Sequence, residues 1–129
     1  LVLPYQPFEV LPQVLSASTF CLVCLDSAFT GYSVPSKTYG IMAAAKPLIA
    51  FLDKNSEIGI AIEEAKCGFV VSAGDDLHAL KSGIRNSIQT GAISIMGNNA
   101  LDAFLKNYTL TLSAEKYYNA FRKTFTKAL

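Results

Sequence analysis

The sequence lacks an excess of either positive or negative charge. Its 129 residues carry eleven Lys and Arg against ten Asp and Glu, and only 16% of them are charged. A protein that attracts nucleic acid through its overall charge needs a clear basic excess, so we expect no nucleic-acid partner. The hydrophobic content of 51% is enough to form a core, which excludes an intrinsically disordered chain.

Cysteine, histidine and long apolar runs are also scarce. Three cysteines make no disulfide framework and indicate a reducing compartment, so we expect a cytoplasmic protein. Cys21 and Cys24 are three residues apart on an expected strand and point to opposite faces, which favours packing over redox or metal chemistry. His78 is the only histidine and has no metal-ligating partners, so we expect no metal. No apolar run approaches the roughly 18 residues of a membrane span.

Short apolar runs alternate with segments of helical spacing along the chain. The run at residues 20–25 is continuous, which predicts a strand buried on both faces. Strands separated by helices indicate parallel βαβ units. We therefore predict an α/β fold: a Rossmann-like, doubly wound parallel sheet in one domain over residues 1–129, truncated at its N-terminal side. The four strands are expected at residues 1–3, 20–25, 47–52 and 69–71.

Helices are expected between and after these strands. The helix that opens at Pro35 should place Tyr39 in the core, on one face with Met42. The Gly91 position and the Gly97-Asn98-Asn99 cluster are expected to interrupt the chain before a tail helix at about residues 113–129. The other helices are expected at residues 8–17, 57–66, 77–88 (with Leu77, Leu80, Ile84 and Ile88 as the apolar stripe) and 101–108.

Three loops follow the expected strands. Ligands of open α/β sheets bind beyond the carboxyl ends of the strands, which selects residues 4–7, 26–36 and 53–56. The second loop ends at a helix start, where exposed backbone amides together with Lys37 would suit a phosphate. Ser36 is expected to cap that helix as well as to lie beside the ligand.

The same loop leads into a recognisable pattern. Residues 34–50 read Val-Pro-Ser-Lys-Thr-Tyr-Gly-Ile-Met-Ala-Ala-Ala-Lys-Pro-Leu-Ile-Ala. This run resembles the signature of family-4-type (group 1) retaining glycosyltransferases with the GT-B fold. Their C-terminal domain carries Pro-Ser-Lys, an aromatic residue, a helix and then Met-Ala-Ala-Gly-Lys-Pro-Val-Ile-Ala, so Ala45 stands where Gly is usual.

The flanking segments agree with this resemblance. Residues 11–25 resemble the family's Leu-Pro…Ser-Ala-Ala-Asp-Val helix and strand, and residues 56–71 resemble its Ser-Glu…Ile-Glu-Glu-Ala-Gly-Cys-Gly-Val-Val segment. The resemblance covers about residues 1–88. It implies that the chain is part of the C-terminal half of a GT-B fold.

The resemblance also implies a ligand and a set of contacts. A nucleotide-diphospho-sugar would be held by this chain, while the acceptor would lie across a cleft on an N-terminal domain. The loop at residues 33–37 would face the diphosphate and the sugar, and residues 4–7 would lie near the base. Neither a cofactor nor a metal is implied. The implied donor-binding residues are Tyr5, Gln6, Ser33, Pro35, Ser36, Lys37, Thr38, Gly40 and Glu57.

Two departures from the family bear on activity. The family has two glutamates separated by seven residues, and here Tyr32 and Gly40 occupy those positions. The family's closely spaced Arg and Lys pair has no counterpart, since Arg85 and Arg122 lie elsewhere in the sequence. The chain therefore looks like the last third of an enzyme. We expect it to hold no catalytic residue and to turn over no substrate by itself.

The tail is basic and aromatic. From residue 106 onward, five Lys and Arg are accompanied by only one acidic residue, Glu115, and four aromatic residues lie in the expected tail helix. In the family, the last helix crosses to the N-terminal domain, so we expect the aromatic rings to pack there and to be exposed without it. A membrane surface is the other candidate partner, which would make the protein peripheral at the inner membrane face. The four rings are those of Tyr117, Tyr118, Phe121 and Phe125.

These features together favour a glycosyltransferase of cell-surface polysaccharide assembly, acting on a saccharide or lipid-linked acceptor. A nucleotide-sugar 2-epimerase of the same fold is an alternative, but residues 31–40 lack the carboxylates and the Gly-rich Glu segment usual in that class. A non-enzymatic binding or receiver-type module is a second alternative. It would use Asp26 and Asp53 with Lys54, which make a poor acidic cluster.

Overall fold

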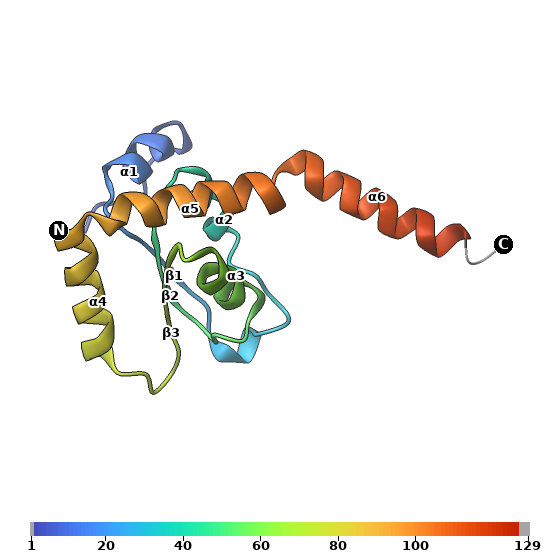
Figure 1. Cartoon of the computed structure of the whole chain (residues 1–129). Coiled ribbons are helices and arrows are strands. Elements are labelled where there is room, and N and C mark those ends of the chain that lie inside the picture. Colours follow the sequence, from blue (N-terminus) through green and yellow to red (C-terminus); the bar gives the residue numbers. More distant parts are fainter. Residues whose placement is uncertain (1, 127–129) are drawn as a thin grey trace.

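Three short parallel strands form the centre of the computed structural model, which describes residues 2–126 (Figure 1). The strands are β1 (Cys21–Cys24), β2 (Leu48–Phe51) and β3 (Gly68–Val71), in the order β1-β2-β3. In the shared register Cys21 pairs with Leu48, which pairs with Gly68. Neighbouring parallel strands need a crossover, and one helix supplies each of the two.

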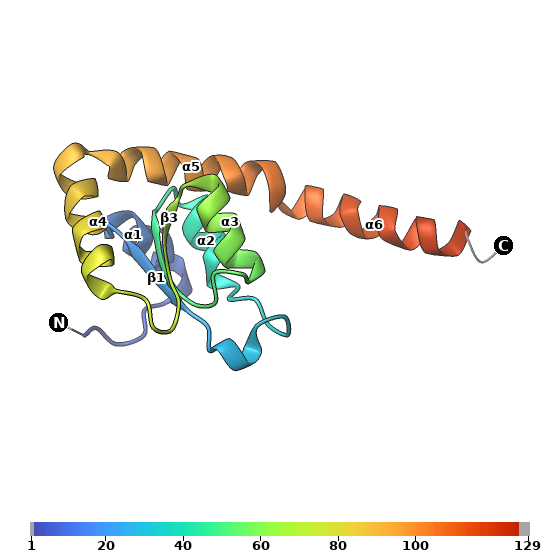
Figure 2. The same ribbon diagram turned by 60° about the horizontal axis from the view of Figure 1, so that its bottom comes forward.

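Helices α2 and α3 are these crossovers, and α5 packs across α2 (Figures 1 and 2). Helix α4 contacts β3, where Gly83 sits against the Phe69 ring. This is a mixed α/β fold with a small parallel sheet, compatible with part of a Rossmann-like domain. The helices are η1 (Phe8–Val10), α1 (Leu11–Ala17), η2 (Ser27–Phe29), α2 (Lys37–Ala43), α3 (Glu57–Ala65), α4 (Leu77–Thr90), α5 (Ala92–Asn107) and α6 (Leu110–Thr126).

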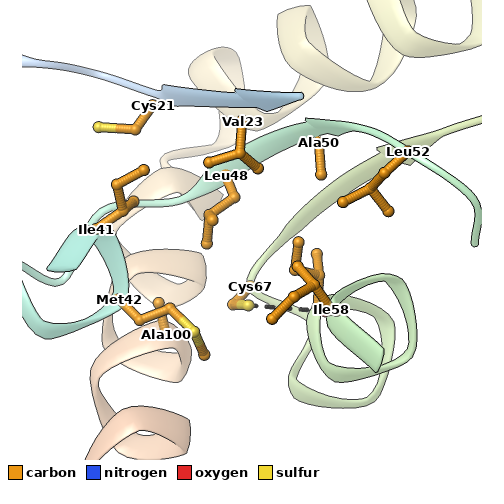
Figure 3. Close-up of a cluster of buried hydrophobic side chains, with 11 residues drawn as sticks. Cys21, Val23, Ile41, Met42, Leu48, Ala50, Leu52, Ile58, Cys67 and Ala100 are labelled. Atoms are coloured by element: carbon orange, nitrogen blue, oxygen red, sulfur yellow. Dashed lines mark hydrogen bonds between the residues drawn. The ribbon is translucent and has the colours of Figure 1, made fainter. Parts of the chain in front are cut away.

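The core lies where the sheet meets α2, α3 and α5 (Figure 3). Met42, Leu48 and Ile62 are completely buried there. Each side chain of this size gains about 1.5–3 kcal/mol on burial, so this cluster is the main source of stability. Cys21, Val23, Ile41, Ala50, Leu52, Ile58, Cys67 and Ala100 complete it.

Residues 2 and 3 of the expected first strand form no strand. Val2 is 96% exposed and Leu3 is exposed, while Leu1 lies outside the described residues. A strand needs a hydrogen-bonded neighbour, and in the described structure β1 pairs only with β2. The described residues therefore form three strands where the sequence predicted four.

The prediction that β1 is buried on both faces is wrong. Cys21 and Val23 point into the core, whereas Leu22 is 59% exposed and Cys24 is exposed. In the register, Leu22 and Phe69 lie on the same face of the sheet. On this face α4 packs against Phe69 of β3, whereas Leu22 of β1 stays exposed. The opposite orientation of Cys21 and Cys24 was predicted and is confirmed.

The expected interruption at Gly97-Asn98-Asn99 is also wrong. The chain turns at Gly91, as predicted, but α5 then runs unbroken through the cluster. A Cβ at Gly97 would collide with the Ala45 carbonyl oxygen, so glycine lets α5 approach the end of α2. Asn99 Nδ2 donates to the Lys66 carbonyl at 3.2 Å. These tertiary contacts outweigh the weak helix propensity of the three residues.

Two other helices differ in detail from the prediction. In α4 only half of the expected apolar stripe packs against the protein. Leu80 and Ile84 are partly buried, whereas Leu77 and Ile88 are exposed. The tail helix α6 begins at Leu110 rather than at residue 113, and residues 127–129 lie outside the described part.

Helix α6 projects from the body of the molecule (Figures 1 and 2). Its four aromatic rings are exposed. Across residues 2–126, every helix falls short of the length and apolarity needed to cross a membrane.

Candidate functional site

A small hollow lies beyond the carboxyl ends of the strands, and we call it the strand-end hollow. It has a volume of about 150 Å³ and brings together Ser33, Pro35 and Glu57, three residues of the expected donor-binding set. Leu25, at the end of β1, forms its floor together with Ile58 of α3. The remaining lining residues are Gly31, Tyr32, Val34 and Ser56.

The loop on one side of the hollow is fixed by its own backbone. Asp26 Oδ1 accepts a hydrogen bond from the Ala28 amide at 2.9 Å and so begins the short helix η2. The Phe29 carbonyl then accepts from the amides of Tyr32 and Ser33, both at 3.0 Å. The backbone of Ser33, which lines the hollow, is thereby held in place.

The start of α3 forms the other side. Ser56 caps the helix, its hydroxyl accepting from the Gly59 amide at 3.1 Å. A Cβ at Gly59 would lie 2.7 Å from the carbonyl oxygens of Asp53 and Lys54, so glycine allows that loop to fold against the helix. Glu57 follows in the first turn, where the helix dipole favours a carboxylate. Glu57 therefore suits the helix dipole and also lines the hollow.

The start of α2 differs from the expected cap. Ser36 has helical backbone angles and its side chain makes no capping hydrogen bond, so that prediction is wrong. The Thr38 amide instead donates to the Pro35 carbonyl at 3.0 Å. Lys37 is exposed at the first position of α2, next to the loop but outside the lining of the hollow.

Thr38 and Gly40 have opposite surroundings. Thr38 is completely buried, and its hydroxyl finds no hydrogen-bond partner within residues 2–126. Its side chain is therefore part of the packing of α2 and is closed to a ligand in this arrangement. Gly40 is exposed, and a Cβ there would meet no atom within 4 Å. The glutamate usual at this position in the resembled family would fit here.

Tyr5 and Gln6 lie apart from the other expected site residues. Tyr5 is 96% exposed, and the Gln6 amide donates to the nearby Pro4 carbonyl at 2.8 Å. Both were placed at a strand end on the expectation of a strand at residues 1–3, and residues 2 and 3 form no strand. In the described structure neither lines the strand-end hollow.

A second, wider hollow of about 520 Å³ lies along the same edge of the sheet. Asp26 and Asp53 line it with Ser72. The Asp53 carboxylate accepts from the Asn55 amide at 2.8 Å, and Asp26 caps η2 as described, so both carboxylates have local structural roles. No group of three or more His, Cys, Asp or Glu residues able to hold a metal ion occurs within the described range.

Two partly buried tyrosines lie near Glu57, and sequence reasoning assigned one of them, Tyr39, to the core. The rings of Tyr39 and Tyr108 are 5.0 Å apart at 45°. Burial raises the pKa of both phenols, and the Glu57 carboxylate raises the pKa of each further. Helical spacing places Tyr39 on a packed face, but no sequence signal brings Tyr108, 69 positions further along the chain, beside it.

Comparison with known proteins points to one class of enzyme. The chain is 31% identical over 103 residues to a probable glycosyltransferase, WbjE, of Pseudomonas aeruginosa. The match covers 80% of this chain and 25% of that protein, so the chain spans about a quarter of the length of this relative. No family model matches the sequence, and no solved structure matches. The similarity supports a relationship to glycosyltransferases at the general level.

Proposed function

We propose that this chain is the donor-binding part of a retaining, family-4-type glycosyltransferase with the GT-B fold. The enzyme would transfer a sugar from a nucleotide-diphospho-sugar to a saccharide or lipid-linked acceptor in polysaccharide assembly. The observation that supports this most is the meeting of Ser33, Pro35 and Glu57 beyond the carboxyl ends of parallel strands, where α/β folds bind nucleotides. The similarity to a probable glycosyltransferase supports the class of reaction.

The size of the strand-end hollow indicates which part of the donor it can hold. Pockets that enclose a whole drug-sized ligand measure about 300–1,000 Å³, so a hollow of about 150 Å³ takes one part of a larger donor. We assign it to the sugar ring, whose hydroxyl groups can donate to Glu57 and exchange hydrogen bonds with Ser33. The diphosphate would then lie at the mouth, toward Ser36 and Lys37.

In this arrangement Lys37 supplies the positive charge that would bind the diphosphate. It is exposed at the start of α2, where backbone amides also point outward. Helix α2 has only seven residues, so its dipole adds little and the ammonium group carries most of the attraction. Catalysis also needs further cationic groups that stabilise the departing diphosphate, and an acceptor. In this proposal the missing Arg and Lys pair belongs to the first part of this domain and the acceptor to an N-terminal domain, so this chain by itself turns over no substrate.

The role of Lys37 can be tested by substitution. We expect Lys37→Ala to weaken the binding of nucleoside diphosphates about three- to tenfold, because it removes one charge-assisted contact at an exposed site. Thermal unfolding should be unchanged, since Lys37 is exposed. The control is Lys81→Ala, which removes an exposed lysine from α4 without touching either hollow. Equal affinity in the two variants, measured by titration calorimetry, would contradict the assignment.

A phosphoryl-accepting receiver-type module is a second candidate, because Asp26 and Asp53 line one hollow at adjacent strand ends. Their hydrogen bonds to local amides favour a structural role instead. Incubation with a small phosphodonor separates the two candidates. A mass increase of one phosphoryl group, lost in Asp53→Asn, would favour the receiver over the transferase.

A further inference from the structure

A third concave surface opens where α2, α3 and the junction of α5 with α6 meet, and we call it the α6 groove. Its volume of about 560 Å³ lies within the range of ligand-binding pockets. Figure 1 shows α6 leaving the body of the molecule at this junction. The residues that matter for its chemistry are Tyr39, Glu57, Asn107, Tyr108, Lys116 and Tyr117.

Three tyrosine rings supply the apolar surface of the groove. Tyr39 and Tyr108 are partly buried and in ring contact with each other. Tyr117 is 69% exposed and comes from α6. Within residues 2–126 the phenol hydroxyls of Tyr39 and Tyr108 have no hydrogen-bond partner, so both are available to a ligand. Such rings present an apolar face and a polar edge to the same molecule.

The polar groups of the groove balance in charge. Glu57 contributes one carboxylate and Lys116 one ammonium group. Lys116 Nζ also donates to the Asn107 carbonyl at 3.1 Å and so ties the first turns of α6 to the end of α5. The carboxylate disfavours an anionic ligand and the ammonium group disfavours a cationic one. Asn107 and Ser113 add neutral hydrogen-bonding groups.

We propose that the α6 groove binds a neutral saccharide ring. A pyranose has apolar C–H faces that can lie on tyrosine rings and equatorial hydroxyls that can pair with the carboxylate, amide and ammonium groups around them. This surface is separate from the strand-end hollow except for Glu57, which lines both. The proposal therefore adds a second carbohydrate-binding surface to the donor site and does not depend on nucleotide binding.

The test is an NMR titration of the 129-residue chain with neutral methyl glycosides: the glucoside, the galactoside, the N-acetylglucosaminide and the rhamnoside. We expect amide shifts at Asn107, Tyr108 and residues 113–117 with at least one of them. Tyr117→Ala should weaken this binding about tenfold, since a stacked aromatic ring contributes about 1.4 kcal/mol. The control is Tyr118→Ala, which removes an equally exposed ring that does not line the groove and should change affinity less than about twofold.

Other results would overturn the proposal. These are the absence of shifts at millimolar concentrations of every glycoside, equal effects of Tyr117→Ala and Tyr118→Ala, or shifts at the groove with tetramethylammonium but with no glycoside. The last result would identify a cation-binding aromatic cage. Failure of the donor proposal is seen elsewhere, as missing nucleotide-induced shifts in residues 26–37, so the two proposals fail independently.

Discussion

Within residues 2–126, two residues other than glycine hold the left-handed backbone conformation. Ala45 has φ 54° where the chain leaves α2, and Lys66 has φ 52° at the end of α3. The resembled family segments have Gly at both positions, and the structure gives the physical reason. An L-residue costs about 1–2 kcal/mol in this conformation, whereas glycine adopts it freely. The sequence showed the departure at Ala45, but only the backbone angles show that it carries strain.

We predict that Ala45→Gly stabilises the fold by about 0.5–1 kcal/mol, because relief of the strained φ exceeds the entropy that glycine adds to the unfolded chain. Denaturant unfolding measures this change. Ala44→Gly is the matched control, since Ala44 has φ −82° and gains nothing from glycine. A variant Ala45→Gly no more stable than Ala44→Gly would show that the strain is absent.

Because the Cys67 thiol is buried, we predict that the free energy of unfolding decreases at alkaline pH. Burial raises the pKa of Cys67 from about 9 to about 11. Between these values the unfolded thiol ionises while the folded one stays neutral, so its contribution is complete below pH 9 and is lost as the pH rises toward 11. We predict a loss on the order of 1–2 kcal/mol across this window.

Cys67→Ala tests this dependence in urea unfolding at several pH values. The variant should be less stable at neutral pH, because a buried group is deleted, and its stability should decline less between pH 9 and 11. Cys24→Ala, which removes an exposed thiol, should keep the decline of the unsubstituted chain. A decline equally steep in Cys67→Ala would assign the effect to other groups, such as the tyrosines.

At the level of elements, periodicity and local chemistry predicted most of the fold. The apolar runs predicted β1, β2 and β3, and the predicted helices α3 and α4 are present, capped by Ser56 and Asp76. The errors share one cause. Contacts between residues far apart in the sequence decide whether these segments form a strand or a helix. Residues 2–3 have no neighbour to pair with, and the Gly97 region stays helical because α5 rests on the end of α2. A single sequence does not display such contacts.

Helix α5 approaches the end of α2 closely at Gly97, so the effect of substituting this glycine can be predicted. We expect Gly97→Ala to destabilise the fold by about 1–3 kcal/mol, although alanine is the better helix former, because its Cβ would collide with the Ala45 carbonyl. Asn98→Ala is the control: Asn98 is exposed in the same turn, so its variant should be neutral or slightly stabilised. Thermal unfolding of both variants decides between propensity and packing, and a stabilised Gly97→Ala would reject the packing explanation.

At the scale of the whole molecule, much apolar surface lacks a partner within residues 2–126. Leu22 is exposed on the open face of β1, and Tyr118, Phe121 and Phe125 of α6, which do not line the α6 groove, are exposed as well. The chain spans only about a quarter of its relative, which is consistent with surfaces that further parts of a longer polypeptide would cover. The exposure of the α6 rings followed from the resemblance, whereas the open face of β1 did not.

The candidate site was only partly predictable on the same scale. Parallel topology brings residues 33–35 and 57 to one edge of the sheet, so their meeting followed from the order of the elements. The burial of Thr38 depends on how α2 rotates against the sheet, and the α6 groove depends on the contact between Lys116 and Asn107. Both are tertiary arrangements that spacing along the chain does not encode.

The central claim is that the carboxyl end of the sheet binds the nucleotide-diphospho-sugar donor. The most direct test is an NMR titration of the chain with UDP, GDP and ADP. The account predicts amide shifts in residues 26–37 and 53–57, largest for one of the three nucleotides. Shifts confined to α4, α5 or α6, or no shift with any of the three, would contradict it.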